Sequence, residues 1–184
     1  MSPRRMAQQV DRWDLPALHR KAAVLLLLYP GAAGTTIVLI RRPQYEGVHS
    51  GQIALPGGAW ETGESLVQTA LREAEEEIGV DPAGLRVLGG LSQLYIPVSN
   101  FNIHPFVAVA EQQPVFRPDP IEVAEIIQVP LEHLLHPDSR GETERDLRSW
   151  GPTLVPHIDA EGHIIWGATA MILAEFFSLL ESVG

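Results

Sequence analysis

The chain has 184 residues, 45% hydrophobic and 20% charged, a composition typical of one globular domain with a substantial core. A formal net charge of −10 argues against a general nucleic-acid-binding protein, and the absence of cysteine excludes disulfides, thiolate nucleophiles and cysteine-ligated zinc. Residues 1–12 lack the apolar core of a signal peptide, and the first apolar run, residues 22–29, is too short to span a bilayer. We therefore expect one cytoplasmic domain, residues 1–184, that binds neither nucleic acid nor membranes.

Two short strands are expected first along the chain, at residues 22–29 and 35–40. Both runs are apolar or β-branched, and the segment between them, which contains Pro and Gly, is typical of a hairpin turn. Further strands are expected at residues 85–94, 103–109, 126–129, 154–158 and 163–166. Helices are expected at residues 65–78, 131–135 and 167–182, and loops at residues 114–120 and 137–152. This order predicts an α/β (α+β) fold, in which helices cover a mixed β-sheet.

The helix expected at residues 65–78 has clear end signals. Ser65 and Gln68 have the spacing of a capping box, and Gly79 followed by Pro82 is typical of a helix stop. At about 100° per residue, one apolar stripe is expected to pack on the sheet. The residues of this stripe are Val67, Leu71, Ala74 and Ile78.

Three carboxylates lie on the opposite side of this helix. Glu73, Glu76 and Glu77 fall within an arc of about 100° and are expected to point away from the core, whereas Glu75 lies outside the arc. Like charges at this spacing disfavour an isolated helix, so a cation should offset them. Hard oxygen ligands suit Mg²⁺ or Mn²⁺. On the spacing alone, however, a solvated helix face is the favoured interpretation.

The segment Leu55-Pro56-Gly57-Gly58, before the helix, favours a functional interpretation. It is a tight turn in which the missing β-carbons let the backbone approach a ligand or a metal. An acidic protein can bind a phosphorylated small molecule there, because a divalent cation bridges the two negative partners. Such a cation can polarise a phosphoryl oxygen, lower the pKa of a bound water and neutralise a leaving phosphate.

A longer pattern joins the turn to the helix. Gly58 is followed after five residues by Glu64, and after seven more by Arg72-Glu73-Ala74-Glu75-Glu76-Glu77-Ile78-Gly79-Val80. This run resembles the signature of the Nudix hydrolase family, G-x5-E-x7-R-E-U-x-E-E-x-G-U, at every polar and glycine position, while Ala74 replaces a larger aliphatic residue. The resemblance implies an α/β/α sandwich around a mixed sheet and hydrolysis of a diphosphate linkage in a nucleoside-diphosphate derivative.

The resemblance also implies roles for individual residues. Divalent ions, Mg²⁺ or Mn²⁺, would be bound by Glu73, Glu76, Glu77 and the carbonyl of Gly58. Arg72 and Glu64 would hold the loop against the helix. The general base of the family varies, and here it is a glutamate of the signature or a carboxylate of a later loop, such as Glu122 or Glu125. Surface charge is the alternative interpretation of both later residues.

Residues 39–58 resemble a second signature, that of coenzyme A pyrophosphatases. Arg42, Gly51 and the Pro-Gly-Gly turn agree with it, whereas Pro43 and Gly47 depart from it. The candidate substrate-binding residues are Arg42, His49, Gly51, Gln52 and Gly57. Coenzyme A or its thioesters, cleaved to 3′,5′-ADP and 4′-phosphopantetheine, are the favoured substrates. The alternatives are ADP-ribose, NADH or (d)NTPs as substrates, or a non-catalytic nucleotide-binding module, and a homodimer is left open.

Overall fold

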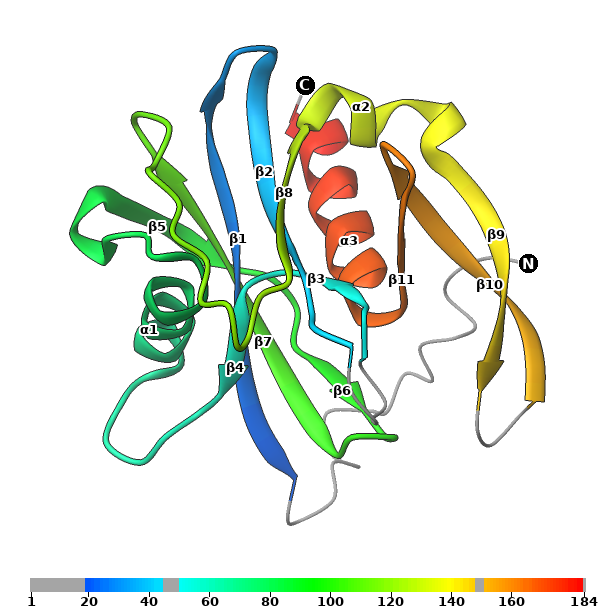
Figure 1. Ribbon diagram of the computed structural model, residues 1–184, viewed down its shortest axis with the longest axis horizontal. Helices are drawn as coiled ribbons and strands as arrows, with labels where there is room; N and C mark the ends of the chain where they lie inside the picture. The colour runs from blue at the N-terminus through cyan, green and yellow to red at the C-terminus, as the bar shows by residue number, and fades with distance from the viewer. Residues whose placement is uncertain (1–18, 45–49, 148–150, 184) are drawn as a thin grey trace.

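The structure is a computed structural model that describes residues 19–44, 50–147 and 151–183 (Figure 1). The first part of the chain forms β1 (Arg20–Gly31), β2 (Gly34–Arg41), β3 (Ile53–Ala54), β4 (Gly57–Ala59), α1 (Leu66–Ile78), η2 (Pro82–Gly84), β5 (Leu85–Gly90), β6 (Leu94–Ile96) and β7 (Phe101–Ala110). The second part forms β8 (Glu125–Pro130), α2 (Leu131–Leu135), η3 (Pro137–Ser139), β9 (Arg140–Leu147), β10 (Gly151–Ala160), β11 (His163–Trp166) and α3 (Gly167–Val183).

The main sheet is mixed and has β1 at its centre. β1 runs parallel to β7 and antiparallel to β2 and β4. β2 also pairs with β3 and β8, and β7 also pairs with β5 and β6, all antiparallel. Strands β9, β10 and β11 form a separate antiparallel sheet of three strands.

Helices cover both faces of the main sheet, as Figure 1 shows. Leu25 and Leu27 of β1 pack in one cluster with Ala70 and Ala74 of α1. Leu26 and Leu28 point to the other face and pack in a second cluster with residues of α3, among them Leu173 and Phe177. A strand buried on both faces is a nearly continuous apolar run, as residues 22–29 are. The expected α/β/α sandwich is confirmed.

Two predicted segments differ from the structure. Residues 137–152, expected as a loop, contain β9, which pairs with β10 along its whole length. β9 has no alternating apolar pattern because it is an edge strand, and charged side chains are common on such edges. Residues 85–94, expected as one strand, form β5 and β6, which pair with opposite ends of β7. Among the helices of the described ranges, none has the length and hydropathy that a membrane crossing requires.

Candidate metal and diphosphate site

Helix α1 begins and ends where the sequence predicts. The Ser65 hydroxyl accepts a hydrogen bond from the Gln68 backbone N–H, and the Gln68 side chain accepts one from the Ser65 N–H, which completes the capping box. Gly79 has the left-handed conformation, with φ of 69°, and its N–H donates to the Glu75 carbonyl. Both ends of the helix are therefore fixed by local hydrogen bonds, and the positions of its glutamates follow.

The buried face of α1 is shifted from the predicted stripe. Ala70, Ala74 and Ile78 are fully buried, whereas Val67 and Leu71 are only partly buried. The small alanines let the helix approach β1 closely, so the residues beside them become buried as well. The prediction that all three glutamates point away from the core is therefore wrong for Glu77, whose exposed fraction is 1%.

Glu77 is held by Gly57, which was expected in a tight turn but begins strand β4 beside β1. Its Oε2 atom accepts a hydrogen bond of 2.8 Å from the Gly57 N–H. Gly57 has φ of 153°, and a β-carbon there would collide with the Ala23 carbonyl oxygen and the Val24 backbone. A β-carbon on Gly58 would take the place of the Glu73 carboxylate. The two glycines thus make room on both sides of β4, so that this strand fits between β1 and α1.

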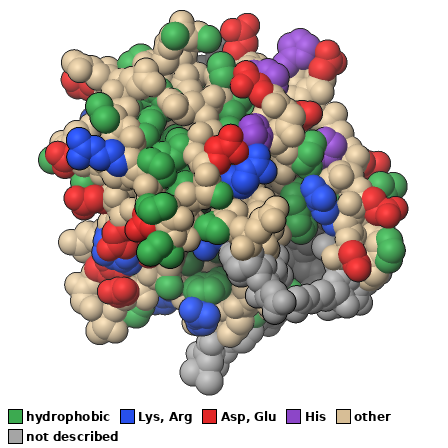
Figure 2. All heavy atoms as spheres, viewed as in Figure 1, with side chains coloured by type: hydrophobic (Ala, Val, Ile, Leu, Met, Phe, Trp, Pro, Cys, Tyr) green, Lys and Arg blue, Asp and Glu red, His purple; other side chains and the backbone are tan. Residues whose placement is uncertain are grey.

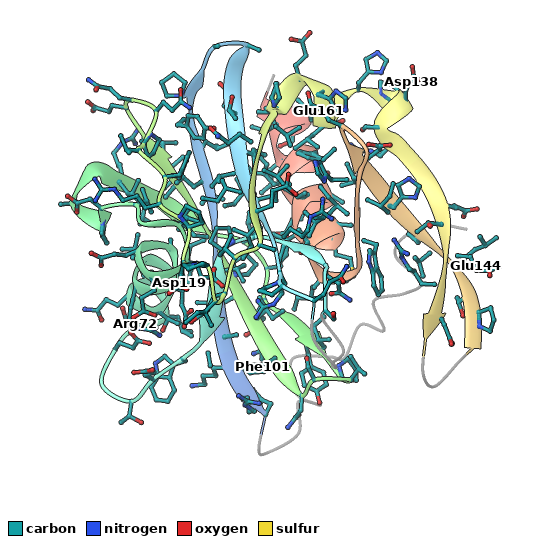
Figure 3. The ribbon with its side chains drawn as sticks, in the orientation of Figure 1. Arg72, Phe101, Asp119, Asp138, Glu144 and Glu161 are labelled. Carbon is teal, nitrogen blue, oxygen red and sulfur yellow. The ribbon has the colours of Figure 1, made fainter. Side chains whose placement is uncertain are left out.

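A later loop docks on the carboxyl end of α1. The N–H groups of Arg117 and Asp119 donate to the carbonyls of Ile78 and Glu77, at 2.8 Å and 3.0 Å. Asp119 then closes a turn, because its carboxylate accepts from the Ile121 N–H at 2.7 Å and its carbonyl accepts from the Val123 N–H at 2.8 Å. Figure 3 shows Asp119 beside α1.

This turn brings a third carboxylate to the helix. Val123 is buried in the cluster under α1, and the adjacent Glu122 is exposed. One carboxylate oxygen each of Glu73, Glu77 and Glu122 lies within 4.8 Å of the other two. Three oxygen ligands at this spacing fit a hard divalent cation such as Mg²⁺ or Mn²⁺. The structure therefore joins two predicted metal ligands with the predicted catalytic residue Glu122.

The electrostatics of this group indicate a missing positive charge. Burial raises the pKa of Glu77 to about 8, against the opposing effects of the Gly57 N–H and the positive charge of Arg42. Burial also raises the pKa of Glu73, against the hydrogen bond and the charge of Arg72, and the charges of Glu76 and Glu122 raise it further. A bound divalent cation would stabilise the ionised forms of these carboxylates, so the residues present fit such an ion.

Glu76 differs from the other two helix glutamates. Its side chain is 55% exposed, and it accepts a hydrogen bond of 3.0 Å from Arg72 Nη1. Within the described residues, it lies outside the group formed by Glu73, Glu77 and Glu122. The structure therefore does not bring the predicted ligand Glu76 together with Glu73 and Glu77.

Arg72 and Glu64 join the loop to the helix. Arg72 donates to both carboxylate oxygens of Glu64, at 3.0 Å and 3.1 Å, and to the carbonyl of Ala59 at 3.2 Å. It also donates to Glu73 at 3.0 Å. The hydrogen bond from Arg72 lowers the pKa of Glu64 to about 2. These contacts orient the Glu73 carboxylate from outside the group of three.

Three candidate substrate-binding residues, Arg42, Gly51 and Gln52, lie at the ends of one loop, whereas Gly57 lies in β4. The N–H of Arg42 donates to the Gln52 carbonyl at 3.0 Å, and the N–H of Gly51 donates to the Pro43 carbonyl at 3.1 Å. Arg42 Nε is buried and, within the described part of the chain, has no hydrogen-bond partner. His49, the remaining candidate, lies outside the described residues.

The sequence pattern missed an interaction that links three elements. Arg41 at the end of β2 binds Glu125 of β8 at 2.8 Å, and its Nη2 donates to Nδ1 of His163 in β11 at 2.7 Å. No local pattern relates residues so far apart, because strand register places Arg41 opposite Glu125 and the packing of β11 beside β3 brings His163 to it. The turn at Asp119 does carry a local signal, since Asp followed by Pro is typical of a turn.

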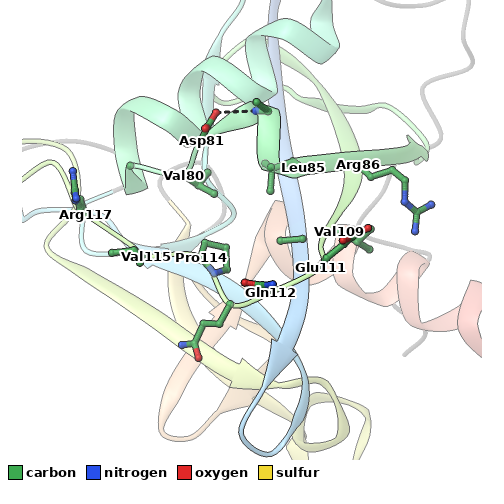
Figure 4. A pocket seen from close by; sticks show the side chains of 15 residues that line it. Val80, Asp81, Leu85, Arg86, Val109, Glu111, Gln112, Pro114, Val115 and Arg117 are labelled. Carbon is green, nitrogen blue, oxygen red and sulfur yellow. Dashed lines mark hydrogen bonds between the residues drawn. The ribbon is translucent and has the colours of Figure 1, made fainter.

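A separate pocket of about 750 Å³ lies where α1 leads through η2 into β5 (Figure 4). Val80, Leu85, Val109 and Pro114 are among its lining residues, and none of the predicted site residues that the structure describes lines it. The carboxylate of Asp81 in its wall accepts the Ala83 N–H at 2.9 Å as a local cap. The pocket is therefore distinct from the carboxylate group.

Comparison with known proteins agrees with this geometry. A family model described as the NUDIX domain matches residues 18–150. The chain is 34% identical over 166 residues to "Uncharacterized Nudix hydrolase NudL" of Pectobacterium atrosepticum. The alignment covers 84% of this chain and 80% of that relative. It is 32% identical over 180 residues to the protein of that name in Escherichia coli O157:H7, and the alignment covers 91% of this chain and 85% of that relative.

Solved structures share the fold at lower sequence identity. The Nudix hydrolase RenU of M. smegmatis aligns with a TM-score of 0.59 and 21% identity, over 90% of this chain and 85% of that chain. The NUDIX domain of Shewanella oneidensis NrtR, complexed with ADP ribose, aligns with a TM-score of 0.51 and 20% identity. This alignment covers 73% of this chain and 87% of that chain.

Proposed function

Since the chain belongs to the Nudix hydrolase family, we propose that it hydrolyses the diphosphate linkage of coenzyme A or its thioesters. Water adds to one phosphorus, the P–O bond to the bridging oxygen breaks, and the products are 3′,5′-ADP and 4′-phosphopantetheine. The observation that supports diphosphate hydrolysis is the convergence of Glu73, Glu77 and Glu122 beside Gly57 and Gly58. The likeness of residues 39–58 to the coenzyme A pyrophosphatase signature supports the choice of coenzyme A. The family makes the chain a hydrolase, and the choice of substrate is the proposal.

Glu73, Glu77 and Glu122 are the residues that would hold Mg²⁺ or Mn²⁺. When bound, the ion supplies charge neutralisation at the diphosphate and lowers the pKa of a coordinated water. Arg72 fixes the Glu73 carboxylate, and the Gly57 N–H fixes that of Glu77. Glu122 is the exposed member of the group, so it is our candidate to accept a proton from the attacking water.

Arg42 is our candidate for binding a substrate phosphate. It lies close enough to Glu77 for its charge to lower the pKa of that carboxyl, yet its own Nε has no hydrogen-bond partner within the described ranges. A guanidinium with an unpaired donor, beside a carboxylate proposed to bind the metal, suits a diphosphate oxygen. The Gly51 and Gln52 backbones hold the loop that carries Arg42, which supports a role in positioning it.

A substrate panel tests this proposal. The purified chain is incubated with Mg²⁺ and coenzyme A, acetyl-coenzyme A, ADP-ribose, NADH or dNTPs, and the products are identified by chromatography and mass spectrometry. We expect coenzyme A and its thioester to be cleaved fastest, and chelation of the metal to abolish turnover. Cleavage of ADP-ribose with no turnover of coenzyme A would overturn the substrate assignment. No turnover of any diphosphate would favour a nucleotide-binding module.

A further inference from the structure

An ion pair lies where two neighbouring strands of the main sheet meet the loops of the candidate site. β2 ends at Arg41, β8 begins at Glu125, and these two residues are cross-strand partners. The guanidinium of Arg41 binds the Glu125 carboxylate, and it also donates a hydrogen bond to the ring of His163. Glu125 is one of the two later carboxylates that the sequence offers as a general base, so its place relative to the metal ligands matters.

The alternation of β2 separates this ion pair from the proposed metal ligands. Leu39 packs in the cluster with α3, and Ile40 packs in the cluster with α1. Arg41 therefore points to the α3 side of the main sheet, and its cross-strand partner Glu125 points to the same side. The three carboxylates proposed to bind the metal lie on the α1 side. This placement argues against Glu125 as the base and favours an indirect role.

The turn that carries Glu122 is attached to Arg41. The Arg41 carbonyl accepts a hydrogen bond of 2.9 Å from the Ala124 N–H, and the next residue, Glu125, binds the guanidinium. The other end of the turn is attached to α1 through the N–H of Asp119. Glu122 therefore lies between an attachment three residues before it and an attachment two residues after it.

The exposure of the ion pair indicates a local effect. The side chains of Arg41 and Glu125 are 37% and 47% exposed, so their attraction adds little to the stability of the whole fold. The hydrogen bonds at the end of a strand pair open more readily than those in its interior. An ion pair at this end therefore orders the start of β8, which directly follows the turn that carries Glu122.

Arg41 is also held from the side of the small sheet. It pairs with Ile53 of β3, and β11, which carries His163, contacts β3. The guanidinium is therefore fixed between β8 and β11. Figure 2 shows basic, acidic and histidine side chains together near the middle of the visible face, between β8 and β11 of Figure 1.

We propose that Arg41, held by Glu125 and His163, is a positioning residue for Glu122. The inference rests on the proposed function, in which Glu122 helps to hold the metal and accepts a proton from the attacking water. Residues that orient a metal-binding side chain from outside typically change metal affinity or activity by about 10–100-fold when they are replaced. The ion pair acts in this way through the backbone of the turn.

Alanine variants of the ion pair test this role. R41A removes the side chain but keeps the carbonyl that accepts the Ala124 N–H. We expect R41A and E125A each to lower kcat about tenfold and to weaken Mn²⁺ binding about tenfold, measured by calorimetry without substrate. Arg86 is an exposed arginine of β5, and R86A is the control expected to keep both values within about twofold. Urea unfolding checks that each variant is folded.

Combination with E122Q separates positioning of Glu122 from general damage. In E122Q the group that Arg41 positions is already lost, so adding R41A should lower kcat and Mn²⁺ affinity no further. An additional tenfold loss in the double variant would overturn the proposal. So would wild-type kcat and Mn²⁺ affinity in R41A.

The single variant E122Q tests the proposed function separately. Wild-type kcat and Mn²⁺ affinity in E122Q would refute the role of Glu122 itself. A large loss in E122Q, with an equal further loss on adding R41A, would refute only the positioning by Arg41. The kinetic measurements use whichever diphosphate the substrate panel identifies, so a wrong choice of coenzyme A does not change their interpretation.

Discussion

At the residue scale, Glu77 shows why a group of carboxylates can persist in a buried place. Burial disfavours its ionised form, and Glu73 and Glu122 add like charge. The Gly57 N–H compensates only part of this cost, because the pKa remains raised to about 8. A divalent cation would offset the remaining cost by pairing with all three carboxylates.

Replacing Glu77 with Gln tests this role. The amide oxygen of Gln can still accept the Gly57 N–H, so the fold should be retained while the metal loses a charged ligand. We expect kcat to fall by about 100-fold or more, measured at saturating Mg²⁺. Glu75 is an exposed residue of the same helix, and E75Q should keep kcat within about twofold of the wild type. Full activity in E77Q would contradict the metal role.

Glu64 has a structural role that depends on pH. Arg72 lowers the pKa of Glu64 from 4.5 to about 2. The ionised Glu64 therefore contributes to stability above pH 4.5, and this contribution is lost as the pH falls toward 2. We therefore expect E64Q to be less stable than the wild type at pH 7, and the difference to shrink at about pH 3. Urea unfolding at both pH values measures this. If E64Q and the wild type differed equally in stability at both pH values, the ion pair with Arg72 would not be the source of the difference.

At the scale of elements, the sequence predicts α1 and its caps but misplaces its buried face. A helical wheel centred on Val67 favours the large apolar residues as the buried face. The helix instead packs through Ala70 and Ala74, because small residues allow it to approach the sheet closely. Glu77 is buried as a consequence. β9 was not predicted because its alternate residues are charged rather than apolar.

The loop that carries Glu122 was predicted as a site for the base but not as a neighbour of α1. Its position depends on backbone hydrogen bonds from Arg117 and Asp119 to the end of the helix. Such contacts join segments far apart in the chain, and no local spacing encodes them. The same holds for Arg41 and His163, which are joined by the packing of β3 against β11.

Gly79 is the point where helix and loop meet, and replacing it with Ala tests their coupling. Its φ is positive, and a β-carbon would lie 2.7 Å from Cβ and 2.9 Å from the carbonyl oxygen of Arg117. We expect G79A to lower the free energy of unfolding by about 1–2 kcal/mol and to reduce kcat, since the loop that carries Glu122 must shift.

The control for this variant is Gly84 in η2. No heavy atom lies within 4 Å of a β-carbon built there, so G84A should leave both stability and kcat nearly unchanged. Urea unfolding and steady-state kinetics measure the two effects. A G79A variant as stable and as active as G84A would show that the loop does not depend on this contact.

At the scale of the whole molecule, the sandwich brings three distant segments together on the α1 side of the main sheet. These are Gly57 and Gly58 of β4 beside β1, the helix itself and the Asp119–Val123 turn. The sequence predicts the first two together because they are close along the chain. The third joins them only because β8 follows it and pairs with β2 beside β1.

The measurement that tests the central claim most directly is a crystal structure with Mn²⁺, in which anomalous scattering locates the ion. We predict at least one anomalous peak within coordination distance of carboxylate oxygens of Glu73, Glu77 and Glu122, close to the distance of about 2.1 Å at which Mg²⁺ binds oxygen. Binding of Mn²⁺ elsewhere only, with these three carboxylates making no contact to it, would contradict the account.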